Sequence, residues 1–402
     1  MKKILIFSLA YFPRHIGGAE IAIKEITDRI KPSDIEFHLI TQRFDESLPL
    51  EERIGTVQVY RIGNGASYLA KILFVLRAAA LGAKLHRTHH FDTAWAMMSY
   101  MVFPVLLMRL WGIRLPYVLT LQEGDPFEHV FGRWHIRLLM PLLKKGFREA
   151  SVVQTISTFL AQWARSAGFR GPLYVVPNGV DTAHFSQEHP QSVIDEIKDS
   201  LGKRMGDVFL ITTSRLVHKN AIDDVIRALT KLPANVRFMV LGTGNDETML
   251  RALAKKEGVV DRVEFLGQIS HAEMPKYLKA SDIFIRPSRS EGMGNSFVEA
   301  MAAGLPVIAT QEGGLADFLF DAKRNPDQPV TGWAVDKDSP DQIVAAVENI
   351  MRSPEKVRAI VATARQMVHE RFDWSLVAKD MREKVFAEAL EISPVAHSDE
   401  RV

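Results

Sequence analysis

The sequence contains no cysteine, which excludes a disulfide framework and thiol catalysis and is compatible with a reducing compartment. It also lacks any run of roughly 18 or more apolar residues, and the richest stretch, 100–108, stops at Arg109, so no membrane span is predicted. The apolar start MKKILIFSLAYFPRH could open a signal peptide, but Pro13 and Arg14 break it and no small-residue cleavage pattern follows. We therefore expect it to form a buried first strand.

Several cofactor signatures are also missing. No G-x-G-x-x-G follows a strand-like run, and no G-K-[ST] P-loop occurs. The 13 histidines show no metal-ligand spacing, and the adjacent His89 and His90 cannot share one helix face. We therefore predict neither a metal nor a bound cofactor.

The net charge of +2 conceals an asymmetry. Residues 1–178 hold 22 Lys and Arg against 14 Asp and Glu, a net charge of +8, and the remainder carries −6. Within the basic part, the stretch 130–149 (VFGRWHIRLLMPLLKKGFRE) interleaves cations with apolar residues. Such a stretch either lies on an anionic membrane surface or packs on the core with a solvated basic edge. Nucleic acid is not expected as a partner, because the excess is modest and no binding module occurs.

The chain of 402 residues, 47% of them hydrophobic, is long enough for two cores. Short Val/Ile/Leu-rich runs alternate with amphipathic ones up to LYVVPN (173–178), and the series restarts at VFLITTS (208–214). This pattern predicts an α/β fold of two doubly wound, Rossmann-like domains, 1–178 and 179–372, joined by the polar stretch 179–206. Ligands are then expected at the carboxyl ends of the strands, in the cleft between the domains. The tail 392–402 is expected to be disordered.

In each half of the chain, one pair of candidate residues follows the first strand. Gly17 and Gly18 precede a helix, so their N–H groups either bind a phosphate or form a tight turn. Arg215 and Lys219 lie just beyond FLITT, where they either hold a diphosphate or are solvated loop cations.

A third segment, EGMGNSFVEAMAAGLP (291–306), places Glu291 and Glu299 eight positions apart, after a buried strand and around the start of a helix expected to end at Gly304. Carboxylates accept hydrogen bonds from neighbouring hydroxyl pairs, and eight helical residues span about 12 Å. One interpretation is therefore that each of the two glutamates binds the hydroxyls of a different sugar ring. The alternative is that Ser296 and Glu299 form a capping box.

Longer stretches carry a family resemblance over nearly the whole chain. They are GGAE, VPNGVDTAHF (176–185), SRLVHKN, LGTGNDETML (241–250), VEFLGQIS (263–270), IRPSRSEGMGNSFVEAMAAGLPVIAT (285–310), EGGLADFL (312–319) and RFDWSLVAKDM (371–381). The chain resembles a retaining GT-B glycosyltransferase of glycosyltransferase family 4, also called the glycosyl transferases group 1. The resemblance implies that the final helix, about 373–391, returns to the first, acceptor-side domain and that 179–372 binds a nucleotide sugar.

The resemblance also implies roles for matching residues. Glu299 would hold the ribose hydroxyls and Glu291 would face the donor sugar. The remaining donor ligands would be Met293, Gly294 and Asn295 through their backbone, Arg215 and Lys219 with Gly18 at the diphosphate, and Gly267 and Gln268 at the base. Such enzymes generally need no metal, because cations and N–H groups neutralise the leaving diphosphate.

The sequence departs from the family pattern at two points. Gln122, followed by Glu123, stands where the family usually has histidine, and glutamine cannot act as a base at neutral pH. We therefore assign Gln122 and Glu123 only as candidates near the acceptor or the sugar. Asn220 and Ala221 replace the Lys-Gly of many members, so Lys219 stands one position early.

The sequence thus predicts an enzyme that transfers a hexose-type sugar from a UDP- or GDP-linked donor to a glycan or lipid-linked acceptor, with retention and without metal. It would be cytoplasmic, with peripheral binding to the cytoplasmic face of a membrane as an option. A nucleotide-sugar epimerase or hydrolase of the same fold, or a catalytically silent nucleotide-sugar-binding subunit, remains an alternative.

Overall fold

The computed structural model describes residues 1–14, 16–65, 67–125 and 134–391 of the chain. The expected tail 392–402 and the first part of the basic stretch 130–149 lie outside the described residues. Contacts divide the chain into two compact units, which are Met1–Asn178 with Trp374–Val402 (unit 1) and Gly179–Asp373 (unit 2).

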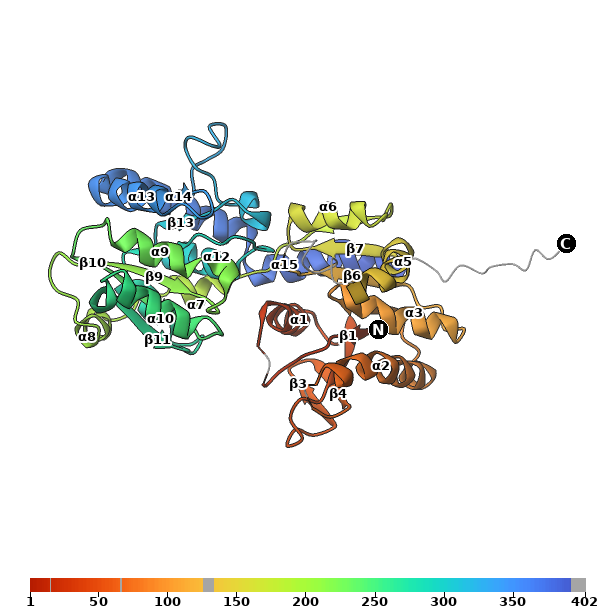
Figure 1. Ribbon diagram of the computed structural model, residues 1–402. Helices are drawn as coiled ribbons and strands as arrows, with labels where there is room; N and C mark the ends of the chain where they lie inside the picture. The colour runs from red at the N-terminus through yellow and green to blue at the C-terminus, as the bar shows by residue number, and fades with distance from the viewer. Residues whose placement is uncertain (15, 66, 126–133, 392–402) are drawn as a thin grey trace. The chain divides into compact units, whose positions relative to one another are not determined.

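Unit 1 is built on an eight-stranded sheet in the order β3-β4-β2-β1-β5-β6-β7-β8, with helices on both faces (Figure 1). Its strands are β1 (Lys2–Phe7), β2 (Ile35–Gln42), β3 (Glu51–Ile54), β4 (Val57–Ile62), β5 (Thr93–Met97), β6 (Tyr117–Leu121), β7 (Val152–Thr155) and β8 (Leu173–Val175). Its helices are α1 (Gly18–Arg29), α2 (Tyr68–His89), α3 (Val102–Leu110), α5 (Trp134–Glu149), α6 (Thr158–Ser166), α15 (Trp374–Asp380) and α16 (Ala387–Glu391), the last two joined by a π-helical turn, Met381–Phe386.

Unit 2 is built on a six-stranded sheet in the order β11-β10-β9-β12-β13-β14, in which every neighbouring pair is parallel. Its strands are β9 (Val208–Thr213), β10 (Val236–Leu241), β11 (Val263–Gly267), β12 (Ile283–Arg286), β13 (Val307–Ala309) and β14 (Trp333–Ala334). Its helices are α7 (Thr182–Ser186), α8 (Gln191–Ser200), α9 (Ile222–Leu229), α10 (Glu247–Lys256), α11 (Met274–Ala280), α12 (Asn295–Ala303), α13 (Pro340–Arg352) and α14 (Pro354–Arg371).

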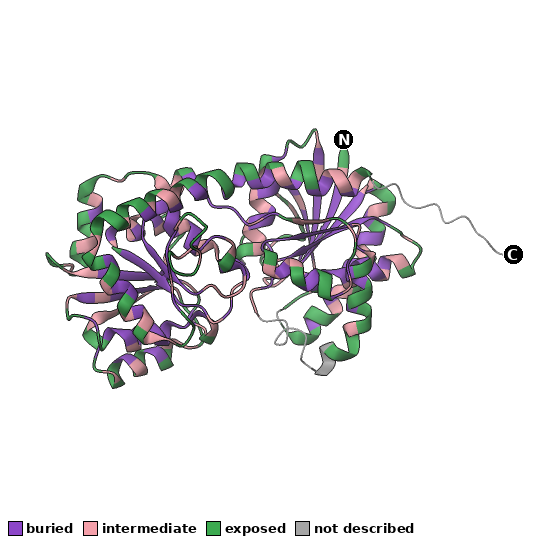
Figure 2. Cartoon of the chain, turned by 90° about the horizontal axis from the view of Figure 1, so that it is seen from above, coloured by how far each residue is buried: buried purple, intermediate pink, exposed green. Residues whose placement is uncertain are grey.

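The central strands are buried on both faces, which explains why they read as continuous apolar runs. All residues of β5, β6 and β12 are buried, and Figure 2 shows the strands of both sheets largely in purple. Helices on each face exclude water from the sheet, so alternation of polar and apolar residues is absent there. The prediction of an α/β fold with two parallel, doubly wound sheets is confirmed.

The C-terminal segment 374–391 packs into unit 1. Trp374, Val377 and Met381 belong to the core that β1, β2 and α1 build, and the Phe386 ring lies 5.1 Å from the Trp95 ring between centroids. Residues distant in sequence therefore complete this core.

Two segments differ from the sequence-based expectation. The polar stretch 179–206, expected only to join the domains, forms α7 and α8, which pack against α12 and α11 of unit 2. The antiparallel edge strand β3 was not expected, because its residues Glu51–Ile54 are too polar and too exposed to give a strand pattern.

Candidate active site

The candidate site lies at one edge of the unit 2 sheet. Because β9 to β13 are parallel, their carboxyl ends and the loops that follow them gather at this edge. The loops are pressed closely together: a Cβ at Gly242 would lie 2.0 Å from the Ser214 carbonyl oxygen, and one at Gly244 would lie 2.2 Å from that of Leu216. Only glycine therefore fits at positions 242 and 244, because any side chain would clash with these carbonyl oxygens.

Arg286, the last residue of β12, holds the side chain of Glu291. Its Nη2 donates a hydrogen bond to Glu291 Oε2 at 2.7 Å, and the two side chains are only 7% and 14% exposed. The other carboxylate oxygen of Glu291 accepts from the Gly292 N–H at 3.2 Å. Both carboxylate oxygens of Glu291 are therefore hydrogen-bonded, one to the end of β12 and one within the loop that follows it.

The backbone of Glu291 is fixed from the loop after β13. The Gly314 N–H donates to the Glu291 carbonyl oxygen at 3.1 Å, and a Cβ at Gly313, where φ is 61°, would lie 1.9 Å from that oxygen. Only glycine can adopt this conformation at this distance. Loops after two neighbouring strands thus fix the position of the acid.

The guanidinium of Arg286 makes further contacts that keep it in place. Nη1 donates to Ser296 Oγ at 2.8 Å, and the group lies 4.2 Å from the centre of the Phe297 ring. Burial lowers the pKa of Arg286 and the nearby Arg215 adds to this, while Glu291 and Glu299 oppose it. Arg286 thus lies within electrostatic range of both glutamates and of Arg215.

Glu299 does not cap its own helix. α12 begins at Asn295 after Gly294, which has φ 89°, and no side chain caps it. Ser296 lies inside the helix and accepts from Arg286 instead. The Glu299 carboxylate, 17% exposed, lies 3.5 Å from His271 Nε2 in the loop after β11. The capping-box alternative is therefore wrong, because the helix starts one residue before Ser296.

The remaining donor-side candidates lie around the same edge. Met293 is buried, and the start of α12 carries the N–H groups of Gly294 and Asn295. Gly267 ends β11 with φ 70°, and Gln268 after it is exposed. The structure thus gathers the loops after β11 and β12 at one edge.

Arg215 and Lys219 lie in the loop after β9. Arg215 is exposed, and its side chain forms no hydrogen bond or ion pair with any residue in the described part of the chain. Its carbonyl oxygen accepts from Asn220 Nδ2 at 2.6 Å, which tightens the loop. An exposed guanidinium at this edge is available to an anionic ligand.

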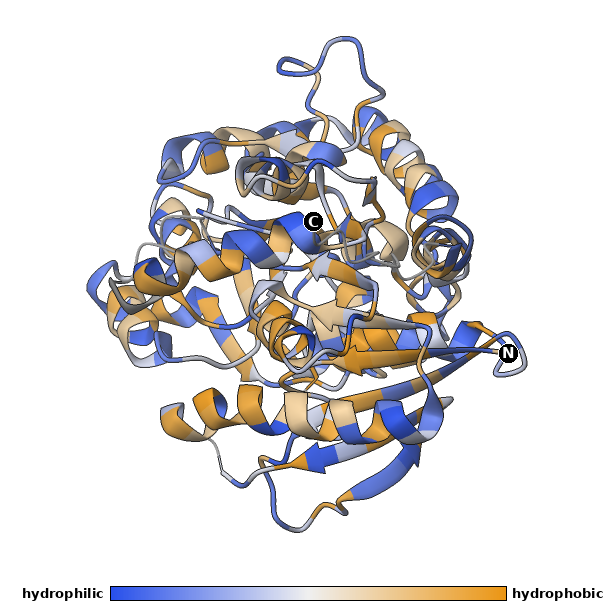
Figure 3. Cartoon of the chain, turned by 90° about the vertical axis from the view of Figure 1, so that its right-hand side faces the viewer, coloured by the Kyte–Doolittle hydropathy of each residue, from blue (hydrophilic) through white to orange (hydrophobic). Residues whose placement is uncertain are grey.

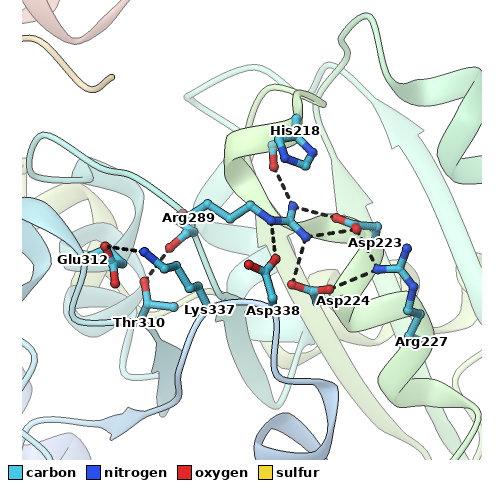
Figure 4. A network of polar contacts seen from close by, with 10 residues as sticks. His218, Asp223, Asp224, Arg227, Arg289, Thr310, Glu312, Lys337 and Asp338 are labelled. Carbon is cyan, nitrogen blue, oxygen red and sulfur yellow. Dashed lines mark hydrogen bonds and ion pairs between the residues drawn. The ribbon is translucent and has the colours of Figure 1, made fainter. Parts of the chain in front are cut away.

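Arg289 ties this loop to the one that carries Glu291 (Figure 4). Its backbone N–H donates to the Lys219 carbonyl oxygen and its Nη1 to that of His218, both at 2.7 Å. The guanidinium also donates to both carboxylate oxygens of Asp223, at 2.9 and 3.0 Å, and to Asp224 Oδ2 at 3.1 Å. The positions of Lys219 and Glu291 are therefore coupled through one arginine.

The two aspartates of this cluster have pKa values shifted in opposite directions. Burial raises the pKa of Asp223, but hydrogen bonds from Arg289 and Arg227 outweigh it and leave that pKa below its usual value. Burial and the neighbouring Asp223 raise the pKa of Asp224. Arg289 and Arg227 thus both offset the negative charge of these two carboxylates.

The unit 1 candidates form a separate group at the carboxyl ends of its strands. Gln122, after β6, and Asn178 exchange two side-chain hydrogen bonds of 3.1 Å each. A Cβ at Gly18 would lie 3.7 Å from Asn178 Nδ2, so these three residues lie together. Gly17 is the N-cap of α1, and its N–H donates to Glu20 Oε2 at 2.8 Å.

Glu123 points into unit 1. It is 4% exposed and accepts hydrogen bonds from the N–H groups of Ser99 at 2.7 Å and Gln122 at 3.0 Å. Burial raises its pKa despite these bonds. Its carboxylate therefore supports the Ser99 turn and the Gln122 loop.

Three residues of these sites escaped the sequence-based prediction, namely Arg286, Arg289 and Asn178. Arg286 and Arg289 stand within the recognised stretch IRPSRSEGMGN, but as cations they gave no signal of being buried. The one available signal was an arginine at the end of a fully apolar strand, where an unpaired charge would be costly.

Comparison with known proteins agrees with this fold. Residues 193–367 match the family model Glycosyl transferases group 1, and residues 16–184 match the model Glycosyltransferase Family 4. The chain belongs to glycosyltransferase family 4, also called the glycosyl transferases group 1. The predicted resemblance is thereby confirmed at the level of the family, and the enzyme is a glycosyltransferase of GT-B fold.

Individual relatives cover almost the whole glycosyltransferase. It is 26% identical over 392 residues to an uncharacterized glycosyltransferase of Methanocaldococcus jannaschii, covering 94% of this chain and 96% of that protein. It is 29% identical over 389 residues to the GDP-mannose-dependent monoacylated alpha-(1-6)-phosphatidylinositol monomannoside mannosyltransferase of Corynebacterium glutamicum, covering 92% and 94%. The crystal structure of HepE from Anabaena in complex with UDP and glucose superimposes with a TM-score of 0.77 and 21% identity, covering 96% of this chain and all of that one.

Proposed function

We propose that this glycosyltransferase transfers a hexose-type sugar from a nucleoside diphosphate donor to a glycan or lipid-linked acceptor, with retention of anomeric configuration and without a metal ion. The observation that carries the proposal is the placement of Glu291. Its carboxylate is fixed by the buried Arg286 at 2.7 Å, at the same sheet edge as Glu299 and the exposed Arg215.

The hydrogen bonds of Glu291 favour retention without a protein nucleophile. A carboxylate whose two oxygens already accept from Arg286 and Gly292 is a poor nucleophile but a good, rigid acceptor for sugar hydroxyls. In the proposed step the acceptor hydroxyl oxygen bonds to the anomeric carbon as the bond to the diphosphate breaks on the same face. The hydroxyl proton passes to the leaving phosphate oxygen.

Cations and backbone N–H groups would stabilise the leaving diphosphate. Arg215 offers a fork of donors and Lys219 a point charge, and Gly18 would contribute from unit 1. Glu299 would accept the ribose hydroxyls, and Gln268 would line the base. Among the described residues, no group of three or more His, Asp or Glu side chains is arranged as metal ligands are.

The named relative and the named structural neighbour differ in the nucleotide that they are described with. One relative is named for GDP-mannose and a phosphatidylinositol mannoside, whereas HepE is described with UDP and glucose. We propose a UDP- or GDP-linked donor, a lipid-linked or glycan acceptor, and action in the cytoplasm at the membrane face. The absence of cysteine is compatible with that compartment.

A nucleotide-sugar panel tests the proposal. We expect UDP- or GDP-sugars of one kind to raise the melting temperature, since a ligand bound to the native state stabilises it. The stabilising donor, incubated with candidate acceptors, should give a product whose anomeric configuration by NMR equals that of the donor. An inverted product would refute retention. Release of free sugar alone would indicate a hydrolase, epimerised donor an epimerase, and binding without turnover a silent subunit.

A further inference from the structure

The outer face of α2 in unit 1 is apolar although it faces solvent. Leu69, Ile72 and Leu76 follow the spacing of one helix face and are 64%, 50% and 50% exposed. The opposite face, with Ala70 and Phe74 among its residues, is buried in the core. This helix is therefore apolar on both sides, and its outer face has no partner among the residues that the structure describes.

Two further helices pack in the same layer as α2. α3 packs against both α2 and α5, and the three form one layer beside the sheet (Figure 1). Exposed apolar side chains also occur at the end of α3 and on α5, and these are Leu110, Trp111, Leu138, Leu139 and Leu142. Figure 3, which faces this side of unit 1, shows hydrophobic stretches next to hydrophilic ones on its helices. We call the exposed side chains of α2, α3 and α5, both these apolar ones and the cations described next, together with Trp111 just after α3, the apolar-basic face.

The charge of the three helices is almost entirely positive. They contain nine Lys and Arg residues, which are Lys71, Arg77, Lys84, Arg87, Arg109, Arg137, Lys144, Lys145 and Arg148, against the single acid Glu149. Their net charge of +8 equals the whole excess of residues 1–178. The rest of that segment is electrically balanced, so its positive charge is concentrated on this layer.

The one acid is already paired within the layer. Glu149 lies 2.9 Å from Arg109 Nη1 and 3.7 Å from Lys145 Nζ. The exposed cations Lys84 and Arg87 on α2 and Lys144 on α5 form no ion pair with any residue in the described ranges. These cations therefore remain available for an external anion.

A hollow adjoins the start of α2. Its volume is about 360 Å³, and its walls include the apolar Leu69 and Leu73 together with Ser67 and Arg77. Apolar walls beside a guanidinium suit the junction between acyl chains and an anionic headgroup.

We propose that the apolar-basic face binds the surface of an anionic lipid bilayer. Its apolar residues would enter the boundary between headgroups and acyl chains, and its cations would contact anionic headgroups. The proposal assigns the surface on which unit 1 meets the lipid-linked acceptor, and in this respect it rests on the proposed function. Among the described residues no helix is long and apolar enough to cross a bilayer, so attachment by this face would lie in the interface plane.

Vesicle flotation of the full chain tests the proposal. We expect binding to vesicles of phosphatidylcholine with 30% phosphatidylglycerol, weak binding to phosphatidylcholine alone, and a fall in binding as salt is raised. Lys84→Gln with Arg87→Gln should weaken partition about thirtyfold, because each cation near such a surface contributes about 1 kcal/mol. The matched control, Lys255→Gln with Lys256→Gln on exposed α10 residues of unit 2, should bind like the parent chain.

The apolar contribution is tested separately. Ile72→Gln with Leu76→Gln should weaken partition about tenfold or more through lost apolar burial. Met249→Gln with Met351→Gln, at 47% and 38% exposure on unit 2, is the control and should have no effect. Glutamine is a good helix former, and equal melting curves show that the variants fold.

The outcomes separate this proposal from the proposed function. Loss of flotation in the α2 variants, with donor binding unchanged, supports the face as the membrane contact. Equal flotation of parent and α2 variants, or equal binding to neutral and anionic vesicles, would overturn it whatever the enzyme transfers. Self-association that the α2 variants abolish, without vesicle binding, would assign the face to a second copy of the chain instead.

Discussion

Arg286 Nη2 and Glu291 Oε2 lie 2.7 Å apart and both side chains are almost completely buried. The pair joins the end of β12 to the loop that follows it, so the position of the carboxylate is set by a strand rather than by a loop alone. Sites supported by rigid elements are held to a smaller spread of geometries. Arg286 thus acts as a positioning residue for Glu291.

The first prediction concerns this pair. Arg286→Gln should lower kcat more than it changes KM for the donor, and should destabilise unit 2 by about 3–5 kcal/mol because Glu291 is left buried without its partner. The double variant Arg286→Gln/Glu291→Gln should lose less unfolding free energy than the sum of the losses in the two single variants, because no unpaired buried charge is left in it. Additive losses of unfolding free energy in urea melts would show that the pair is not coupled.

The second prediction separates the two glutamates. Glu299→Gln should weaken both the donor and the free nucleoside diphosphate about ten- to a hundredfold, because a hydrogen bond to a charged group contributes about 1.5–3 kcal/mol. Glu291→Gln should leave the free nucleotide almost unaffected and slow transfer by a similar factor. Calorimetric titration of both ligands gives the two patterns. Parent-like binding and turnover in both variants would mean that the site is misplaced.

The third prediction concerns Arg289. Arg289→Gln leaves Asp223 and Asp224 buried side by side, so unit 2 should lose about 3–5 kcal/mol at pH 7. In the parent chain the lowered pKa of Asp223 stabilises the fold above its unfolded pKa, and this stability is lost as the pH falls through the folded pKa. In the variant the repulsion is relieved on protonation, so stability should rise between pH 7 and 4.

Arg227→Gln is the matched control for Arg289→Gln. Its guanidinium binds the same two aspartates, at 2.7 and 3.1 Å, but is 43% exposed. We expect a loss of about 1 kcal/mol or less from this more solvated pair. Equal losses in the two variants would mean that burial of the Arg289 side chain adds nothing.

The fourth prediction concerns metal. If Arg215 and loop N–H groups neutralise the leaving diphosphate, transfer should proceed at an unchanged rate in excess chelator. Arg215→Gln should slow transfer about a hundredfold, and added magnesium should not restore the rate. Activity that vanishes in chelator and returns with magnesium or manganese would refute metal independence.

The fifth prediction concerns pH and His38 of β2. Burial lowers the pKa of His38, although its hydrogen bond to Glu36 opposes this. The unfolded chain therefore binds this proton first, and stability should fall as the pH drops below about 6.5, with a slope of at most about 1.4 kcal/mol per pH unit for one proton. His86, whose pKa burial also lowers, adds in the same direction.

His38→Gln should reduce this slope in chemical melts between pH 7 and 5. His369→Gln, on an exposed position of α14, serves as the control and should leave the slope unchanged. A slope that is the same in all three proteins would exclude His38 as its source.

The sequence alone was sufficient for the fold class and the family. Continuous apolar runs predicted β1, β9 and β12, because strands covered on both faces must be apolar throughout. The stretch 291–304 predicted a loop followed by a helix ending at Gly304, which the structure places there with φ 87°. These features depend on local pattern, which a sequence displays directly.

Tertiary structure decided what depends on contacts between distant residues. In the sequence Arg286 is a cation at a strand end and Arg289 a cation in a loop, and only the folded sheet brings Ser296, Asp223 and the carbonyl oxygen of His218 around them. Glu299 has capping-box spacing, but the helix begins at Asn295. A charged side chain can be buried only where partners replace its hydration. Here those partners come from other strands and loops, so they are present only once the parallel sheet has aligned the carboxyl ends of its strands.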